Sequence, residues 1–64
     1  MQTAEILMRE AAQIIKDYNA GRLRGHEKEA LARVDEKTHA VALLTGQTYD
    51  AIARKIDMED YDIG

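Results

Sequence analysis

The sequence predicts an all-α fold, an antiparallel helical hairpin followed by a short third helix, and three observations support it. Residues 27–45 run for nineteen positions without glycine or proline, and Gly25 and Gly46 bracket them. Apolar side chains recur at helical spacing there and in the segments at about 3–20 and 48–57. The connection between the first two segments is short, which suits antiparallel helices packed side by side. We expect these helices to form an oligomeric bundle.

The segment 27–45 is the predicted centre of the fold because it carries apolar side chains on two sides. At about 100° per residue, five side chains share one face, and Leu44 lies on its shoulder. The face consists of Leu31, Val34, Thr38, Val41 and Thr45. Ala32, Ala40 and Leu43 fall on the opposite side. A helix with two apolar faces is expected to have neighbours on both.

The first helix carries two adjacent apolar rows. One row is Leu7, Ala11, Ile14 and Tyr18, and the next is Met8, Ala12 and Ile15. Together they cover a wider arc than one neighbouring helix of so short a chain would bury. Gly21 is placed to end this helix in the left-handed conformation that glycine adopts without steric cost.

The third helix is predicted from a cap and a stripe. Thr48 is a suitable N-cap, since its hydroxyl can accept a hydrogen bond from a free amide of the first turn. One apolar stripe follows it, made of Tyr49, Ile52, Ala53 and Ile56.

Composition limits the core of this 64-residue chain and favours self-association. The chain has no cysteine, phenylalanine or tryptophan, and ten of its residues are alanine, so no disulfide supports the fold and the core must come from Leu, Ile, Val, Met and Ala with three tyrosines. Small domains without such support often gain stability from a partner chain. We therefore expect a homo-oligomer, most simply a dimer. The predicted core and oligomer residues are Leu7, Ile14, Tyr18, Leu31, Val34, Val41, Leu44, Ile52 and Ile56.

Charge divides the chain into a helical domain, residues 1–56, and an acidic C-terminal tail, residues 57–64. The tail holds four of the twelve acidic residues and no base, and the net charge of the chain is −3. This balance disfavours non-specific binding of nucleic acid, which needs an excess of Lys and Arg. No apolar run is long enough for a membrane span, and the first residues do not resemble a signal peptide. We expect a cytoplasmic protein that contacts no membrane.

Two charged segments are the candidate partner-binding sites. The basic loop supplies Arg22, Arg24, His26 and Lys28. The acidic tail supplies Glu59, Asp60, Tyr61 and Asp62. Cationic side chains near a helix N-terminus suit an anion or an acidic partner, whereas an acidic and apolar tail suits a basic surface of another protein. The tail is expected to be ordered only by a partner, or to fold back on Arg22 and Arg24.

No constellation predicts catalysis, a cofactor or a metal. Glu36 and His39 have the Glu-x-x-His spacing of ferritin-like carboxylate bundles, but they lie away from the face that holds Val34 and Val41. A solvent-exposed imidazole paired with a neighbouring carboxylate explains His39 as well. We expect no enzyme activity.

Residues 43–56 contain Gly46, Thr48, Ile52 and Ala53 in the order and spacing of a helix-turn-helix. The segment resembles the first half of that motif in response-regulator output domains and sigma-type DNA-binding regions. The resemblance implies a recognition helix directly afterwards, which would enter the major groove. The acidic tail occupies that position instead.

These patterns favour a small non-catalytic oligomer that acts through protein–protein interaction. Its size and composition are typical of phage- or plasmid-type regulators and inhibitors. Two alternatives stay open. One is a DNA-binding transcription regulator that uses the partial helix-turn-helix, and the other is an oligomer that sequesters a phosphate-bearing small molecule at the basic loop.

Overall fold

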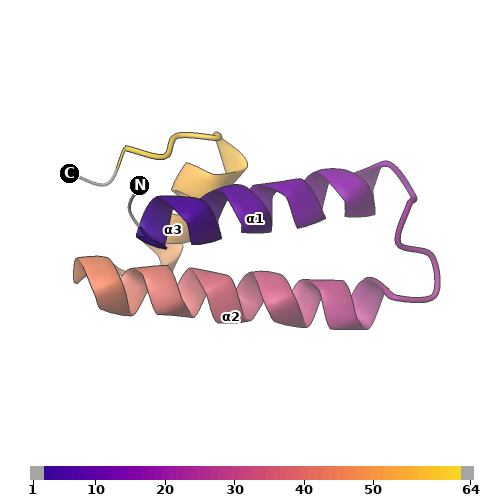
Figure 1. Cartoon of the computed structure of the whole chain (residues 1–64), viewed down its shortest axis with the longest axis horizontal. Helices are drawn as coiled ribbons and strands as arrows, with labels where there is room; N and C mark the ends of the chain where they lie inside the picture. The colour runs from indigo at the N-terminus through magenta and orange to yellow at the C-terminus, as the bar shows by residue number, and fades with distance from the viewer. Residues whose placement is uncertain (1–2, 63–64) are drawn as a thin grey trace.

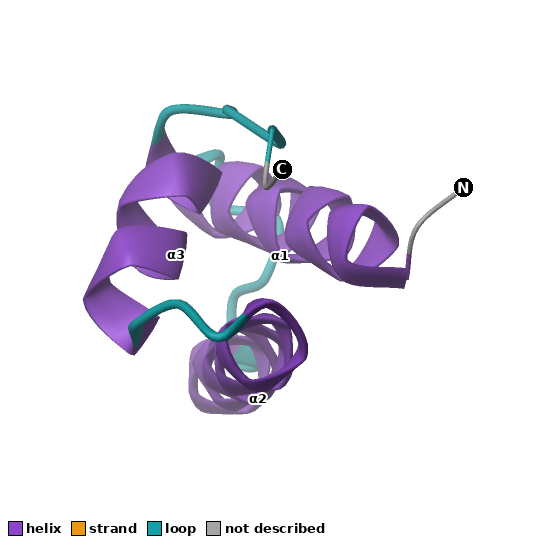
Figure 2. Cartoon of the chain, turned by 90° about the vertical axis from the view of Figure 1, so that its left-hand side faces the viewer, coloured by secondary structure: helices purple, strands orange, loops and turns teal. Residues whose placement is uncertain are grey.

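The computed structural model describes residues 3–62, which form three helices and no strand (Figure 1). Helix α1 spans Thr3–Asn19, α2 spans Glu27–Thr45 and α3 spans Tyr49–Asp57. α1 and α2 run antiparallel, and α3 packs against both, so the three helices form a triangle in end view (Figure 2). The predicted all-α fold and its helical hairpin are confirmed. None of these helices is long and apolar enough to cross a bilayer.

Helices α1 and α2 each end at a glycine in the left-handed conformation. Gly21 follows α1 at φ 75°, where its amide donates to the Tyr18 carbonyl and the next amide donates to the Asp17 carbonyl. Gly46 ends α2 at φ 71°, and its amide donates to the Ala42 carbonyl. These are the two common ways of satisfying the last carbonyls of a helix, and both need a left-handed residue. The predicted role of both glycines is confirmed.

The end of α3 has the same hydrogen bonds but no glycine. Glu59 lies at φ 54°, and its amide donates to the Ile56 carbonyl. The amide of Asp60 donates to the Lys55 carbonyl at 2.8 Å, which completes the motif seen at the end of α1. A side chain in this conformation costs roughly 1–2 kcal/mol because its Cβ crowds the following carbonyl. Glu59 therefore adopts this backbone conformation at a local energetic cost.

The predicted cap of α3 is also confirmed. Thr48 is extended, with φ −77° and ψ 156°, and its hydroxyl accepts a hydrogen bond from the Ala51 amide at 3.2 Å. The hydroxyl satisfies one of the amides that a helix start leaves without a backbone partner.

Replacing Thr48 with alanine should destabilise the protein by about 1 kcal/mol, because the Ala51 amide loses its acceptor. For a chain of this size, that corresponds to a melting midpoint lower by roughly 4–8 °C, measured by circular dichroism. Thr48→Ser is the matched control, since it keeps the acceptor and should melt close to the parent. Equal melting of Thr48→Ala and Thr48→Ser would contradict the capping role.

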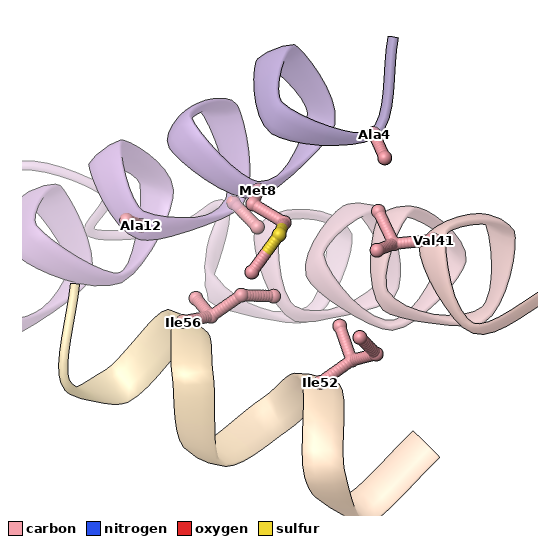
Figure 3. Close-up of a cluster of buried hydrophobic side chains, with 7 residues drawn as sticks. Ala4, Met8, Ala12, Val41, Ile52 and Ile56 are labelled. Carbon is pink, nitrogen blue, oxygen red and sulfur yellow. The ribbon is translucent and has the colours of Figure 1, made fainter. Parts of the chain in front are cut away.

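The core lies where all three helices meet. Met8 of α1, Val41 of α2 and Ile52 of α3 are completely buried, and Ile56 is nearly so. Met8 extends from α1 toward α3 (Figure 3). The rest of the buried cluster is Ala4, Ala11 and Ala12. Because α1 contributes mainly alanines, a few longer side chains fill most of the space between the helices.

One polar side chain lies in this interior without leaving a polar atom unpaired. Thr38 is buried, and its hydroxyl donates to the Val34 carbonyl at 2.7 Å within α2. Within residues 3–62, no buried side-chain nitrogen or oxygen lacks a hydrogen-bond partner. The predicted place of Thr38 on the core face is correct, and the hydrogen bond removes the cost of burying it.

α3 braces only one half of the hairpin. It has nine residues, whereas α1 has seventeen and α2 nineteen. The turn of the chain between α1 and α2 lies at the opposite end of the molecule from the start of α1 (Figure 1). Within residues 13–36, Ala30 is the only buried residue. The core is therefore concentrated beside α3.

This asymmetry decides which predicted core residues are buried. Val41, Ile52 and Ile56 lie in the core, whereas Leu7, Ile14 and Val34 are half-buried. The exposed members of the predicted set are Tyr18 at 39%, Leu31 at 49% and Leu44 at 60%.

A core position for the three exposed residues is therefore incorrect within a single chain, for two reasons. Tyr18 and Leu31 belong to the half of the hairpin that α3 leaves uncovered. Leu44 lies in the last turn of α2, where no other described residue covers it enough to bury it.

Candidate functional site

The basic loop lies between α1 and α2, and two of its four predicted residues contact carboxylates of the same chain. The Arg22 guanidinium contacts the Asp17 carboxylate at 3.1 Å, and Nδ1 of His26 lies 3.8 Å from the Glu29 carboxylate. Arg24 is exposed and makes no ion pair with any residue in the described range 3–62.

Lys28, in the first turn of α2, is exposed and likewise unpaired within that range. The adjoining Glu27 carboxylate accepts a hydrogen bond from the Gly25 amide at 2.9 Å. An acidic side chain of the same chain therefore occupies the position at this amide that an anion would otherwise take. Of the four residues predicted for the basic loop, only Arg24 and Lys28 thus lack an ion-pair partner within residues 3–62.

The acidic tail turns back over the helices after α3, as Figure 1 shows for its described part. Its first contact is with α1, where the Glu59 carboxylate lies 2.7 Å from the Lys16 ammonium. This hydrogen bond and the opposite charge raise the pKa of Lys16. The described tail is therefore attached to its own chain.

Further along, the tail contacts α3 and an earlier turn of α1. Lys55 donates to the Asp62 carbonyl at 2.7 Å and lies 3.8 Å from the Asp60 carboxylate. Tyr61 is half-buried and packs against the hydrophobic core. The Arg9 guanidinium lies 4.5 Å from the centre of the Tyr61 ring, a favourable cation–π distance.

These contacts correct the expectation that the tail is unattached or rests on Arg22 and Arg24. Residues 58–62 instead lie on Arg9, Lys16 and Lys55, three cations that we call the tail site. A sequence signal for two of these three cations does exist. Arg9 and Lys16 are seven residues apart, so they lie on one face of α1, with Tyr61 supplying an apolar group to cover the core beside them.

His39 belongs to a small cluster that joins α2 to the start of α3. The Tyr49 hydroxyl donates to Asp35 at 2.8 Å, and this hydrogen bond raises the pKa of Tyr49. The His39 ring lies 4.6 Å from the Tyr49 ring, and its Nε2 is 3.7 Å from Asp35. Glu36 takes no part in these contacts. Across residues 3–62, no group of three or more potential ligands is gathered for a metal ion.

An exposed apolar patch lies at the C-terminal end of α2. It consists of Leu43, which is 86% exposed, and Leu44, which is 60% exposed. Ala40, one turn earlier, is half-buried. The sequence indicated both leucines, since Leu43 fell on the second face of this helix and Leu44 on the shoulder of the first. The two side chains are consecutive in α2 and point about 100° apart around its axis, and both are exposed within the part of the chain that the structure describes.

The surface depression between α1 and α2 is shallow and open. It is lined by Glu10, Gln13, Ile14, Arg33 and Lys37. Its one carboxylate contacts Lys37, and it contains no nucleophile with an adjacent base. The depression therefore provides no constellation for acid–base or nucleophilic chemistry.

The segment that resembles half of a helix-turn-helix comprises the end of α2, the turn after it and α3. Gly46 and Thr48 form the turn before it, but residues 58–62 form no second helix. Glu59 and Asp60 lie on lysines of their own chain. Within the described residues, no helix follows α3 at the place where the resemblance implies a recognition helix.

Comparison of the chain with models of protein families, with curated proteins and with solved structures finds no match.

Proposed function

We propose that the protein is a small non-catalytic binding protein, a regulator or inhibitor, that forms homo-oligomers and acts by contacting other proteins. The observation that carries this proposal is the apolar patch of Leu43 and Leu44, which are 86% and 60% exposed. Two adjacent leucines on the surface of a chain with so few large apolar side chains favour a contact surface.

The patch is suited to association because it is not needed for folding. The core closes through Met8, Val41 and Ile52 without either leucine. Full burial of a leucine side chain contributes about 1.5–3 kcal/mol, so covering the patch is favourable. In a two-fold dimer the same patch is buried on both chains, which doubles that contribution. A second copy is therefore the first occupant that we propose.

The protein should have at least twice the 7.2 kDa chain mass in light scattering at micromolar concentration. Leu43→Glu should reduce the mass to that of one chain, because a carboxylate in an apolar contact loses its hydration without gaining a partner. Met58→Glu is the control, since Met58 is 75% exposed but lies beyond α3, away from the patch. A monomeric parent, or equal dissociation by both substitutions, would contradict the proposal.

The partner protein can be sought by affinity capture from the native host with mass spectrometry. Recovery that depends on Leu43 would support a contact through the patch. The two alternatives make different predictions. A transcription regulator would bind duplex DNA with a strong dependence on salt. A sequestering oligomer would purify with nucleotide absorbance, and the unpaired Arg24 and Lys28 favour this alternative over the first.

A further inference from the structure

The acidic tail is bound to its own chain as a peptide ligand would be. Within four consecutive residues, it presents a carboxylate to Lys16, an aromatic ring to Arg9, and a carbonyl and a carboxylate to Lys55. The cations come from α1 and α3, two elements that are separate in the sequence. The tail site thus matches the pattern of an acidic segment with a central aromatic residue.

The contacts that hold the tail on its site are weak enough for another segment to displace the tail. Lys16 and Glu59 are exposed by 55% and 48% in their side chains, and water weakens ion pairs at such positions. Glu59 holds an unfavourable left-handed conformation, whereas glycine occupies the equivalent position after α1. A residue kept in such a conformation is a common sign of a functional constraint, and here its carboxylate contacts Lys16.

We propose that Arg9, Lys16 and Lys55 form a binding site for an acidic segment of a partner protein that carries an aromatic side chain. The chain's own residues 58–62 occupy this site until the partner's segment displaces them. The site is separate from the apolar patch of α2, so this proposal does not rest on the proposed function.

Competition by the tail determines the affinity that a partner experiences. A segment tethered by a short linker acts at an effective concentration in the millimolar range. When the tail fills its site for about 90% of the time, the apparent affinity of a partner segment falls about tenfold. Weakening the tail should therefore strengthen binding in trans, which an unspecific surface would not show.

The test uses the full chain and a synthetic peptide with the sequence of residues 57–62. In the double variant Glu59→Gly, Tyr61→Ala, the tail loses two contacts while glycine favours the backbone at position 59. NMR titration should show the peptide binding this variant at least about tenfold more tightly than the parent. The amide shifts should centre on the tail site, and a peptide with alanine in place of tyrosine should bind more weakly.

A charge substitution tests the site itself. Adding Lys16→Glu to the double variant should abolish peptide binding, whereas Arg33→Glu, at an exposed cation of α2 without an ion-pair partner among the described residues, should leave it intact. Circular dichroism confirms beforehand that each variant is helical. Equal peptide binding by the parent and the double variant would overturn the proposal. So would equal loss with Arg33→Glu, or the same shifts with inorganic phosphate at matched ionic strength.

Discussion

Val41→Asp should abolish the helical fold. Val41 is completely buried where the three helices meet, and the core cluster around it consists of apolar residues. An aspartate at this position would therefore have no cation in the cluster with which to pair. An unpaired buried charge costs roughly 3–5 kcal/mol. A core in a chain of this length seldom supplies more than about 3–5 kcal/mol in total. The circular dichroism signal of the variant at 25 °C should therefore be that of an unfolded chain.

The control for Val41→Asp is the same change at an exposed position of the same helix. Ala32 lies on the solvent side of α2, so Ala32→Asp tests the effect of aspartate on helix propensity alone. It should retain a helical spectrum with a slightly lower midpoint. If the two variants melt alike, α2 does not face the core through Val41.

Met8→Ala should produce the second large effect, a cavity that the neighbouring alanines cannot fill. Met8 is completely buried and extends toward Ile56, whereas Ala4, Ala11 and Ala12 have no atoms to reach into the vacated space (Figure 3). Truncation of a buried methionine to alanine costs about 2–5 kcal/mol. The melting midpoint should fall on the order of 10 °C or more, measured by thermal denaturation.

Met58→Ala provides the matched comparison for this truncation. Met58 is 75% exposed just after α3, so removing its side chain leaves no cavity. Its midpoint should stay close to that of the parent. A similar loss of stability in both methionine variants would mean that a cavity in the core does not account for the effect at Met8.

The features that sequence could predict are those with local causes. Gly21 and Gly46 end their helices and Thr48 begins α3, because each effect depends on a backbone conformation or a hydrogen bond within a few residues. The helical period also placed Val41 and Ile52 on inward faces, and both are fully buried. These signals were sufficient for the fold.

The features that sequence could not predict depend on where distant segments meet. Leu31 has the same helical phase as the core face, yet it is 49% exposed because α3 stops short of it. Four neighbouring carboxylates suggested repulsion in the tail, because the sequence around the tail does not reveal that Lys16 of α1 lies beside Glu59. The candidate tail site is therefore a product of the tertiary arrangement.

The half-length third helix has a consequence for local motion. Beside α3 the hairpin is closed by the Met8 cluster, whereas within residues 13–36 Ala30 is the only buried residue. Regions with few buried apolar contacts unfold locally at a lower free energy than the core. We therefore expect backbone amides near the connection between α1 and α2 to exchange with solvent through partial separation of that end, and those beside Met8 and Val41 to exchange only when the whole chain unfolds.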